Sequence, residues 1–111
     1  MGRFTYQSGQ HVDIDDRPLA HLQVVIANKL RRNESFVFTW RDDVSVGDGR
    51  TSVWLHPAVA LAFKYYGGRH PKLNRAWIEA LAATANSPTG LYLVPEPAEG
   101  SALTSDGFDA G

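Results

Sequence analysis

With 111 residues, 43% of them hydrophobic, the chain fits one domain with one core, and this excludes both a second domain and wholesale disorder. No stretch approaches the ~20 apolar residues of a membrane span, and the N-terminal residues lack the apolar run of a secretory signal. Cysteine is absent, which excludes disulfides and thiolate metal sites. We therefore expect a cytoplasmic protein with no membrane partner.

The formal net charge is −1, but the charge is uneven along the chain. Residues 1–97 carry 11 basic and 9 acidic groups, a net charge of +2, which is milder than that of a dedicated nucleic-acid-binding domain. From residue 98 onward the chain consists mainly of Gly, Ser, Ala and acidic residues. We predict a single α+β domain over residues 1–97 and a disordered acidic tail over residues 98–111.

Near the N-terminus two segments, 3–7 and 11–15, alternate apolar and polar residues with period two. A three-residue loop between them places their apolar residues, such as Phe4 and Val12, on one face. Gly9 or one of its neighbours can adopt the positive φ that such a loop needs. The pattern therefore predicts a β-hairpin.

A helix start follows at residues 15–18, where two aspartates precede Pro18. Apolar residues then recur at helical spacing, at Leu19, Leu22, Val25, Ile26 and Leu30. We expect the helix to end near Arg32. Its polar face, which we expect to be solvated, carries Arg17, His21, Asn28, Arg31 and Arg32.

Three strands are predicted next, over residues 35–41, 51–56 and 60–66. If they pair in order as an antiparallel meander, their large apolar residues all face the core. Ser52 then lies opposite Lys64. The other face carries Val37, Thr39, Arg41, Ser52, Trp54, His56, Ala62, Lys64 and Tyr66.

A second helix is expected from His70-Pro71 to about Asn86, with Leu73 and Trp77 pointing inward. Asn74 lies near this apolar stripe, and a buried amide there needs partners, either loop backbone or a ligand in a site. Residues 90–94 predict a last strand. The order ββ-α-βββ-α-β indicates an α+β fold in which an antiparallel sheet has two helices packed on one face.

The outer face of the expected meander combines cations with aromatic rings. We predict that Arg41, Arg50, Trp54, Lys64 and Tyr66 form a binding site, assisted by Arg69 and Arg75. Such a surface suits base stacking with phosphate contacts, or an aromatic patch that binds a protein partner or a second copy of the chain. The alternative is that the hairpin or the tail covers Trp54.

Acidic residues cluster at 13–16 and 42–48, but the spacing of a calcium-binding EF-hand is absent. Turn and cap chemistry accounts for these acids. The four histidines lack zinc-site spacing, and no phosphate-binding glycine loop occurs. We therefore expect no metal and no cofactor, and a non-catalytic binding module is our main hypothesis.

Five segments of the chain are distinctive: Trp40-Arg41-Asp42-Asp43, Gly47-Asp48-Gly49-Arg50-Thr51, Lys64-Tyr65-Tyr66-Gly67, Leu73-Asn74-Arg75-Ala76-Trp77-Ile78 and Asn86-Ser87-Pro88-Thr89-Gly90-Leu91-Tyr92. With these segments the chain resembles a family of small, uncharacterised actinobacterial proteins. The resemblance runs from Gly2 to about Glu96, and many members carry the label "ATP-dependent DNA ligase". It implies either a nucleotidyltransferase that uses ATP and magnesium or an accessory role in DNA end-joining.

The active-site motif of such ligases is incomplete in this chain. The motif is Lys-x-Asp-Gly, whose lysine attacks the α-phosphate of ATP and becomes covalently adenylated. Val46 stands at the lysine position before Asp48-Gly49, and in Lys64-Tyr65-Tyr66-Gly67 a tyrosine replaces the aspartate. Lys64 is therefore the candidate nucleophile of the ligase hypothesis.

Overall fold

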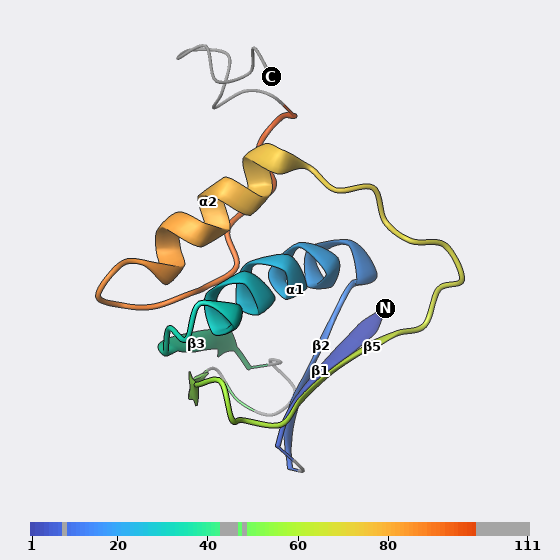
Figure 1. Ribbon diagram of the computed structural model, residues 1–111. Coiled ribbons are helices and arrows are strands. Elements are labelled where there is room, and N and C mark those ends of the chain that lie inside the picture. Colours follow the sequence, from blue (N-terminus) through green and yellow to red (C-terminus); the bar gives the residue numbers. More distant parts are fainter. Residues whose placement is uncertain (8, 43–46, 48, 100–111) are drawn as a thin grey trace.

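The computed structural model describes residues 1–7, 9–42, 47 and 49–99 of the protein (Figure 1). In this part of the chain the elements are β1 (Gly2–Tyr6), β2 (Gln10–Ile14), α1 (Asp16–Arg31), β3 (Phe36–Arg41), β4 (Arg50–Leu55), β5 (Leu61–Tyr65) and α2 (Arg75–Ala85). The α+β class and the order of strands and helices are confirmed. Most of the expected tail lies outside the described residues, as do Asp43, Val46 and Asp48.

The strands form two antiparallel sheets, one with the order β2-β1-β5 and one that pairs β3 with β4. The predicted hairpin β1–β2 is confirmed and its apolar residues share a face, but its register is shifted by two residues from the expected one: Phe4 lies opposite Val12 and Tyr6 opposite Gln10, and Gln7, which follows β1, adopts a φ of 57°. The predicted meander is wrong, because β5 pairs with β1 and not with β4. Lys64 therefore lies opposite Arg3 instead of Ser52.

The sequence pattern predicted correctly which side chains of the strands face the core, but it predicted the wrong partner for β5. Both outcomes have the same physical cause. Period-two alternation determines which side chains point to the core, but it does not determine which strand lies alongside. Phe38 and Val53 are buried and Trp54 and Lys64 are exposed, as predicted. Phe4 of β1 is fully buried, and its ring meets the rings of Phe38 and Phe63 edge-on at centroid distances of 5.2 and 5.4 Å. One aromatic side chain of β1 thus joins the two sheets.

Helix α1 packs against β1 and β5, and α2 packs against α1 and β3 (Figure 1). The apolar stripe of α1 is buried as predicted from Leu19 to Ile26. His21 was expected on the solvated face, but it is fully buried between the two helices, against the ring of Trp77. Neither helix in the described part of the chain is long and apolar enough to cross a membrane.

Helix α2 begins at Arg75, later than the expected start at His70-Pro71. Asn74 is its N-cap, and the Asn74 side-chain oxygen accepts a hydrogen bond from the N–H of Ala76 at 3.0 Å. Leu73, which was expected to point inward, precedes the helix and is 45% exposed. The chain between β5 and α2 runs as an extended arm along one side of the molecule (Figure 1).

After α2 the chain returns to the edge of β3. Leu91 forms a parallel bridge with Phe38: its N–H donates to the carbonyl of Val37 at 2.7 Å, and its carbonyl accepts from the N–H of Thr39 at 3.0 Å. This single bridge represents the expected strand at 90–94. Gly90 has a φ of 87°, and a Cβ there would lie 2.5 Å from the carbonyl oxygen of Val37. Only glycine allows this close approach without strain.

Candidate ligand-binding face

The side of the β3–β4 sheet that points away from the core carries polar, cationic and aromatic side chains. We call it the β3–β4 outer face, and it consists of Val37, Thr39, Arg41, Arg50, Ser52 and Trp54. These residues form three cross-strand pairs: Val37 with Trp54, Thr39 with Ser52, and Arg41 with Arg50. Because side chains on one face are two residues apart, successive pairs are separated by roughly 7 Å.

Two arginines, Arg41 and Arg50, lie opposite each other at one end of this face. Asp42 and Gly49 form a hydrogen-bonded pair at 2.9 Å, so the neighbouring pair Arg41–Arg50 is the non-hydrogen-bonded kind, with Cα atoms about 4.5 Å apart. Like charges directly opposite each other destabilise a sheet. Neither arginine makes an ion pair with any residue that the structure describes. A bound anion would therefore relieve their repulsion.

Hydroxyl groups and rings occupy the rest of the face. The hydroxyls of Thr39 and Ser52 share a 2.6 Å hydrogen bond in the middle row. Trp54 is 53% exposed, so the alternative that the hairpin covers it does not hold. The parallel bridge of Leu91 to Phe38 places the next residue, Tyr92, beside Thr39, where it is 45% exposed. The β3–β4 outer face thus presents one ring, two hydroxyls and two cations, and Tyr92 lies next to it.

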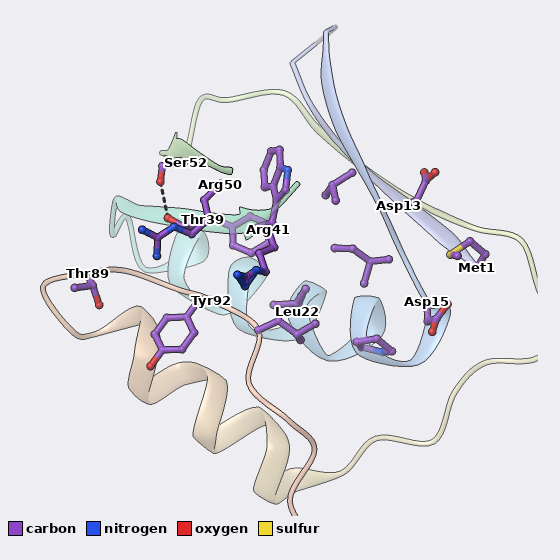
Figure 2. A pocket seen from close by; sticks show the side chains of 16 residues that line it. Met1, Asp13, Asp15, Leu22, Thr39, Arg41, Arg50, Ser52, Thr89 and Tyr92 are labelled. Atoms are coloured by element: carbon purple, nitrogen blue, oxygen red, sulfur yellow. Dashed lines mark hydrogen bonds between the residues drawn. The ribbon is translucent and has the colours of Figure 1, made fainter. Parts of the chain in front are cut away.

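A cleft of about 1160 Å³ opens beside the outer face. Figure 2 shows Thr39, Arg41 and Arg50 on one side of the cleft and Asp13 and Asp15 on the other, with Tyr92 at the margin and its ring directed away from the arginines. The interior is apolar, with contributions from Leu22, Phe38, Trp40 and Ile14. A mostly apolar hollow with polar groups at its margins is the common form of a ligand site.

The acidic wall of the cleft is partly neutralised. Arg3 donates to Asp13 through Nε at 2.8 Å and Nη2 at 3.4 Å. These hydrogen bonds hold the pKa of the Asp13 carboxyl below its usual value. The cations Arg41 and Arg50 have no such partner among the described residues, so the unbalanced charge of the cleft is positive at their end.

The structure separates Lys64 and Tyr66 from Trp54. Lys64 and Tyr66 lie at the outer side of the three-stranded sheet, where the Lys64 ammonium is 5.7 Å from the centroid of the Tyr66 ring. Tyr66 is 57% exposed. The cation-and-ring surface expected from the sequence is therefore split between two sheets, and only Arg41, Arg50 and Trp54 share a face.

Arg69 and Arg75 lie elsewhere. Arg69 lines a second cleft of about 780 Å³ between α1 and the arm that precedes α2, together with Arg31 and His70. Arg75 forms a surface ion pair with Glu79, at 3.7 Å. Neither residue belongs to the β3–β4 sheet or lines the cleft beside it.

Two of the acids considered as cation ligands accept hydrogen bonds within the described part of the chain, but neither caps a helix, and the N-cap residue Asp15 makes no side-chain cap hydrogen bond. Asp16 accepts a hydrogen bond from the N–H of Gly67 at 2.9 Å, and Asp42 accepts one from the Thr51 hydroxyl at 2.8 Å. Within residues 1–7, 9–42, 47 and 49–99, no three His, Asp or Glu side chains lie close enough to hold a metal ion together.

Residues 89–97, which we call the strap, carry Tyr92 to the cleft and are anchored by Asn74. The Asn74 side chain is buried and donates to Glu96 Oε2 and to the carbonyl of Pro97, both at 2.9 Å. Trp77 donates from its indole N–H to the carbonyl of Val94 at 2.9 Å. Of the two alternatives for the Asn74 amide, the one in which it binds loop backbone is confirmed.

Arg17 and His21 complete this anchor. Arg17 donates to both carboxylate oxygens of Glu96, at 2.9 and 2.6 Å. The hydrogen bond with Arg17, followed by that with Asn74, lowers the Glu96 pKa from 4.5 to about 2. His21 Nε2 accepts from the Asn74 N–H at 2.7 Å, so its Nδ1 carries the proton and donates to the Arg17 carbonyl.

No local sequence pattern predicts this network. Its members come from residues 17–21, 74–77 and 94–97, and no local spacing connects three such distant segments. A weaker signal was available, because Asn74 lies directly before the apolar run of α2, where an N-cap residue belongs.

Fold and site together define a class: a small α+β domain with two sheets, one of which presents a cationic and aromatic outer face beside a cleft. Residues 1–96 match the family described as "Domain of unknown function (DUF7882)", and the chain belongs to this family. The match includes every strand and helix as well as Glu96, which anchors the strap. No match was found among curated proteins or among solved structures.

Proposed function

We propose that the protein is a cytoplasmic, non-catalytic module that binds single-stranded nucleic acid on the β3–β4 outer face. The observation that carries this proposal is the cross-strand pair Arg41–Arg50, which lacks an acidic partner among the described residues. A phosphate accepts charge-assisted hydrogen bonds from both guanidinium groups and removes their mutual repulsion.

The remainder of the face suits nucleosides. Trp54 lies four residues from Arg50 on the same side of β4, about 13 Å away, and its exposed ring offers a stacking platform. The hydroxyls of Thr39 and Ser52 lie between the cations and the ring and can bond sugar or phosphate oxygens. A flat sheet surface accommodates unpaired bases, whereas reading duplex DNA requires an element that enters a groove.

Trp54 and Tyr66 allow a controlled test, because both rings are exposed but they belong to different sheets. A labelled single-stranded oligonucleotide is titrated at low salt against the wild type, Trp54→Ala and Tyr66→Ala. Losing one stacked base contact weakens binding about tenfold or more. We expect this loss for Trp54→Ala and wild-type affinity for Tyr66→Ala. Equal affinity of both variants, or no binding by the wild type, would overturn the proposal.

The ligase hypothesis depends on Lys64, and the geometry gives it little support. Lys64 is exposed, lies opposite Arg3 and beside Tyr66, and lines neither of the two clefts. A lysine nucleophile needs a pocket that holds the α-phosphate next to its amine. Incubation with ATP and magnesium followed by mass spectrometry tests this hypothesis, since a covalently bound nucleotide monophosphate on Lys64 would establish it over the binding module.

A further inference from the structure

The outer edge of β4 has no neighbouring strand in the described part of the chain. Along β3, Val37 and Thr39 direct their backbone groups away from β4, because they bond Leu91 on the other side. In an antiparallel pair, when one residue directs its N–H and C=O groups away from the partner strand, the residue opposite it also directs its groups away. Their partners Trp54 and Ser52, and with them Arg50, therefore direct their N–H and C=O groups outward from β4.

A contact of Tyr6 agrees with this direction. The Tyr6 hydroxyl, which comes from the other sheet, donates to the carbonyl of Trp54 at 3.0 Å. A carbonyl oxygen has two lone pairs, so it can accept a second bond. The outward backbone groups of Arg50 and Ser52 have no partner among the described residues. An edge of this kind is a template for another strand.

We infer that this edge binds a second copy of the chain, β4 against β4, antiparallel about a two-fold axis at Ser52. In this register Ser52 of one copy exchanges two hydrogen bonds with Ser52 of the other, and Arg50 pairs with Trp54 of the second copy. The outward backbone groups of Arg50, Ser52 and Trp54 then all form hydrogen bonds with the second copy. A register centred on Arg50 would oppose two like charges instead, and it uses fewer backbone groups.

The side chains of β4 favour pairing with a second copy of the same strand. Arg50 and Trp54 lie on the same face of β4, so across the two-fold axis each guanidinium lies next to an indole that is half exposed in the single chain. Arginine against tryptophan is the most favourable cation–π combination. The edge is thus self-complementary. Arg50 of each copy lies next to Trp54 of the other copy, so the same contact forms twice.

Pairing would join the β3–β4 sheets of two copies into one four-stranded sheet, β3-β4-β4-β3. Each Arg41–Arg50 pair stays on the same side of that sheet, because pairing at an edge preserves the face of every side chain. The inference does not depend on the proposed nucleic-acid function. The interface is small, and interfaces well below ~1,200 Å² are typical of transient association.

Two substitutions at Ser52 separate edge pairing from side-chain effects. Proline removes the outward N–H and the hydroxyl but no backbone hydrogen bond between β3 and β4, and proline is tolerated at edge strands in this orientation. Alanine keeps the N–H and removes only the hydroxyl that bonds Thr39. Sedimentation equilibrium of the full chain over a concentration series should show a dimer for the wild type and Ser52→Ala. Ser52→Pro should weaken dimerisation about tenfold or more.

Exchanging Arg50 and Trp54 tests the proposed register of the two β4 strands. Trp54→Arg places arginine opposite Arg50 of the second copy and should weaken the dimer, while the double variant R50W/W54R restores the opposite pairing and should recover it. Amide hydrogen exchange at Ser52 should slow as protein concentration rises. A monomer with fast exchange at Ser52 overturns the inference. A monomer with slow exchange also overturns it, since the edge would then be covered by a segment of its own chain.

Discussion

The side-chain amide of Asn74 donates a 2.9 Å hydrogen bond to Glu96, 22 residues further along the chain. Asn74 also caps α2 through its side-chain oxygen, so one buried side chain both starts a helix and fixes the end of the strap. The strap in turn places Tyr92 beside the β3–β4 outer face. The stability of α2 and the position of the strap therefore both depend on this connection.

Asn74→Ala removes the cap of α2 and leaves Glu96 without one of its donors. Losing an N-cap costs about 1 kcal/mol, and unpaired buried groups add to that, so we expect a loss of about 2 kcal/mol in the free energy of unfolding. Asn28→Ala is the matched control, because within the described part of the chain the Asn28 side-chain oxygen accepts a hydrogen bond only from the exposed Arg31. Urea denaturation measures both variants, and equal stabilities would contradict the role assigned to Asn74.

Glu96 predicts a specific loss of stability in acid. Its pKa is lowered from 4.5 to about 2 in the folded protein, chiefly by the hydrogen bond with Arg17. A carboxyl with a lowered pKa stabilises the fold above its unfolded pKa, and this contribution disappears as pH falls from about 4.5 to about 2. Glu96→Gln should therefore be less stable than the wild type at pH 7.

The same variant provides the readout. The difference in urea midpoint between the wild type and Glu96→Gln should shrink as pH is lowered from 5 to about 2, because the wild-type carboxyl becomes protonated. A difference that stays constant over this range would show that the Arg17–Glu96 contact does not set the pKa of Glu96.

Gly90→Ala tests the close approach of the strap to β3. Gly90 has a φ of 87°, and an added Cβ would lie 2.5 Å from the Val37 carbonyl oxygen. The left-handed conformation costs alanine about 1–2 kcal/mol and the contact adds to it, so we expect destabilisation of about 2 kcal/mol or more. At Gly68 an added Cβ meets nothing within 4 Å, so Gly68→Ala should leave stability almost unchanged. Thermal unfolding compares the two, and equal effects would contradict the assigned contact.

The faces of the strands and the apolar stripe of α1 could be predicted from the sequence, because both follow from local periodicity. Phe38, Val53 and Leu22 are buried as that periodicity requires, and Trp54 is exposed. The partner of β5 could not be predicted in this way. Segments 51–56 and 60–66 are close in the sequence, which favoured a hairpin, but β5 pairs with β1 and packs Phe63 against Phe4.

The candidate site was predicted in part for the same reason. Arg41, Arg50 and Trp54 share a face because their positions depend on β3 and β4, which pair as expected. Lys64 and Tyr66 were assigned to that face through the incorrect neighbour. Tyr92 was not assigned to it at all, since it reaches the face through the strap, whose anchors are distant in sequence.

The salt dependence of single-stranded DNA binding by Arg41→Gln, with Arg31→Gln as control, tests the central claim most directly. Arg31 is an exposed arginine of α1, outside the β3–β4 outer face. Each phosphate contact contributes about −0.7 to the slope of log K against log salt concentration for single strands. We predict that Arg41→Gln makes the slope shallower by about 0.7 and that Arg31→Gln leaves it unchanged. Equal slopes for the wild type and Arg41→Gln would contradict phosphate binding at the arginine pair.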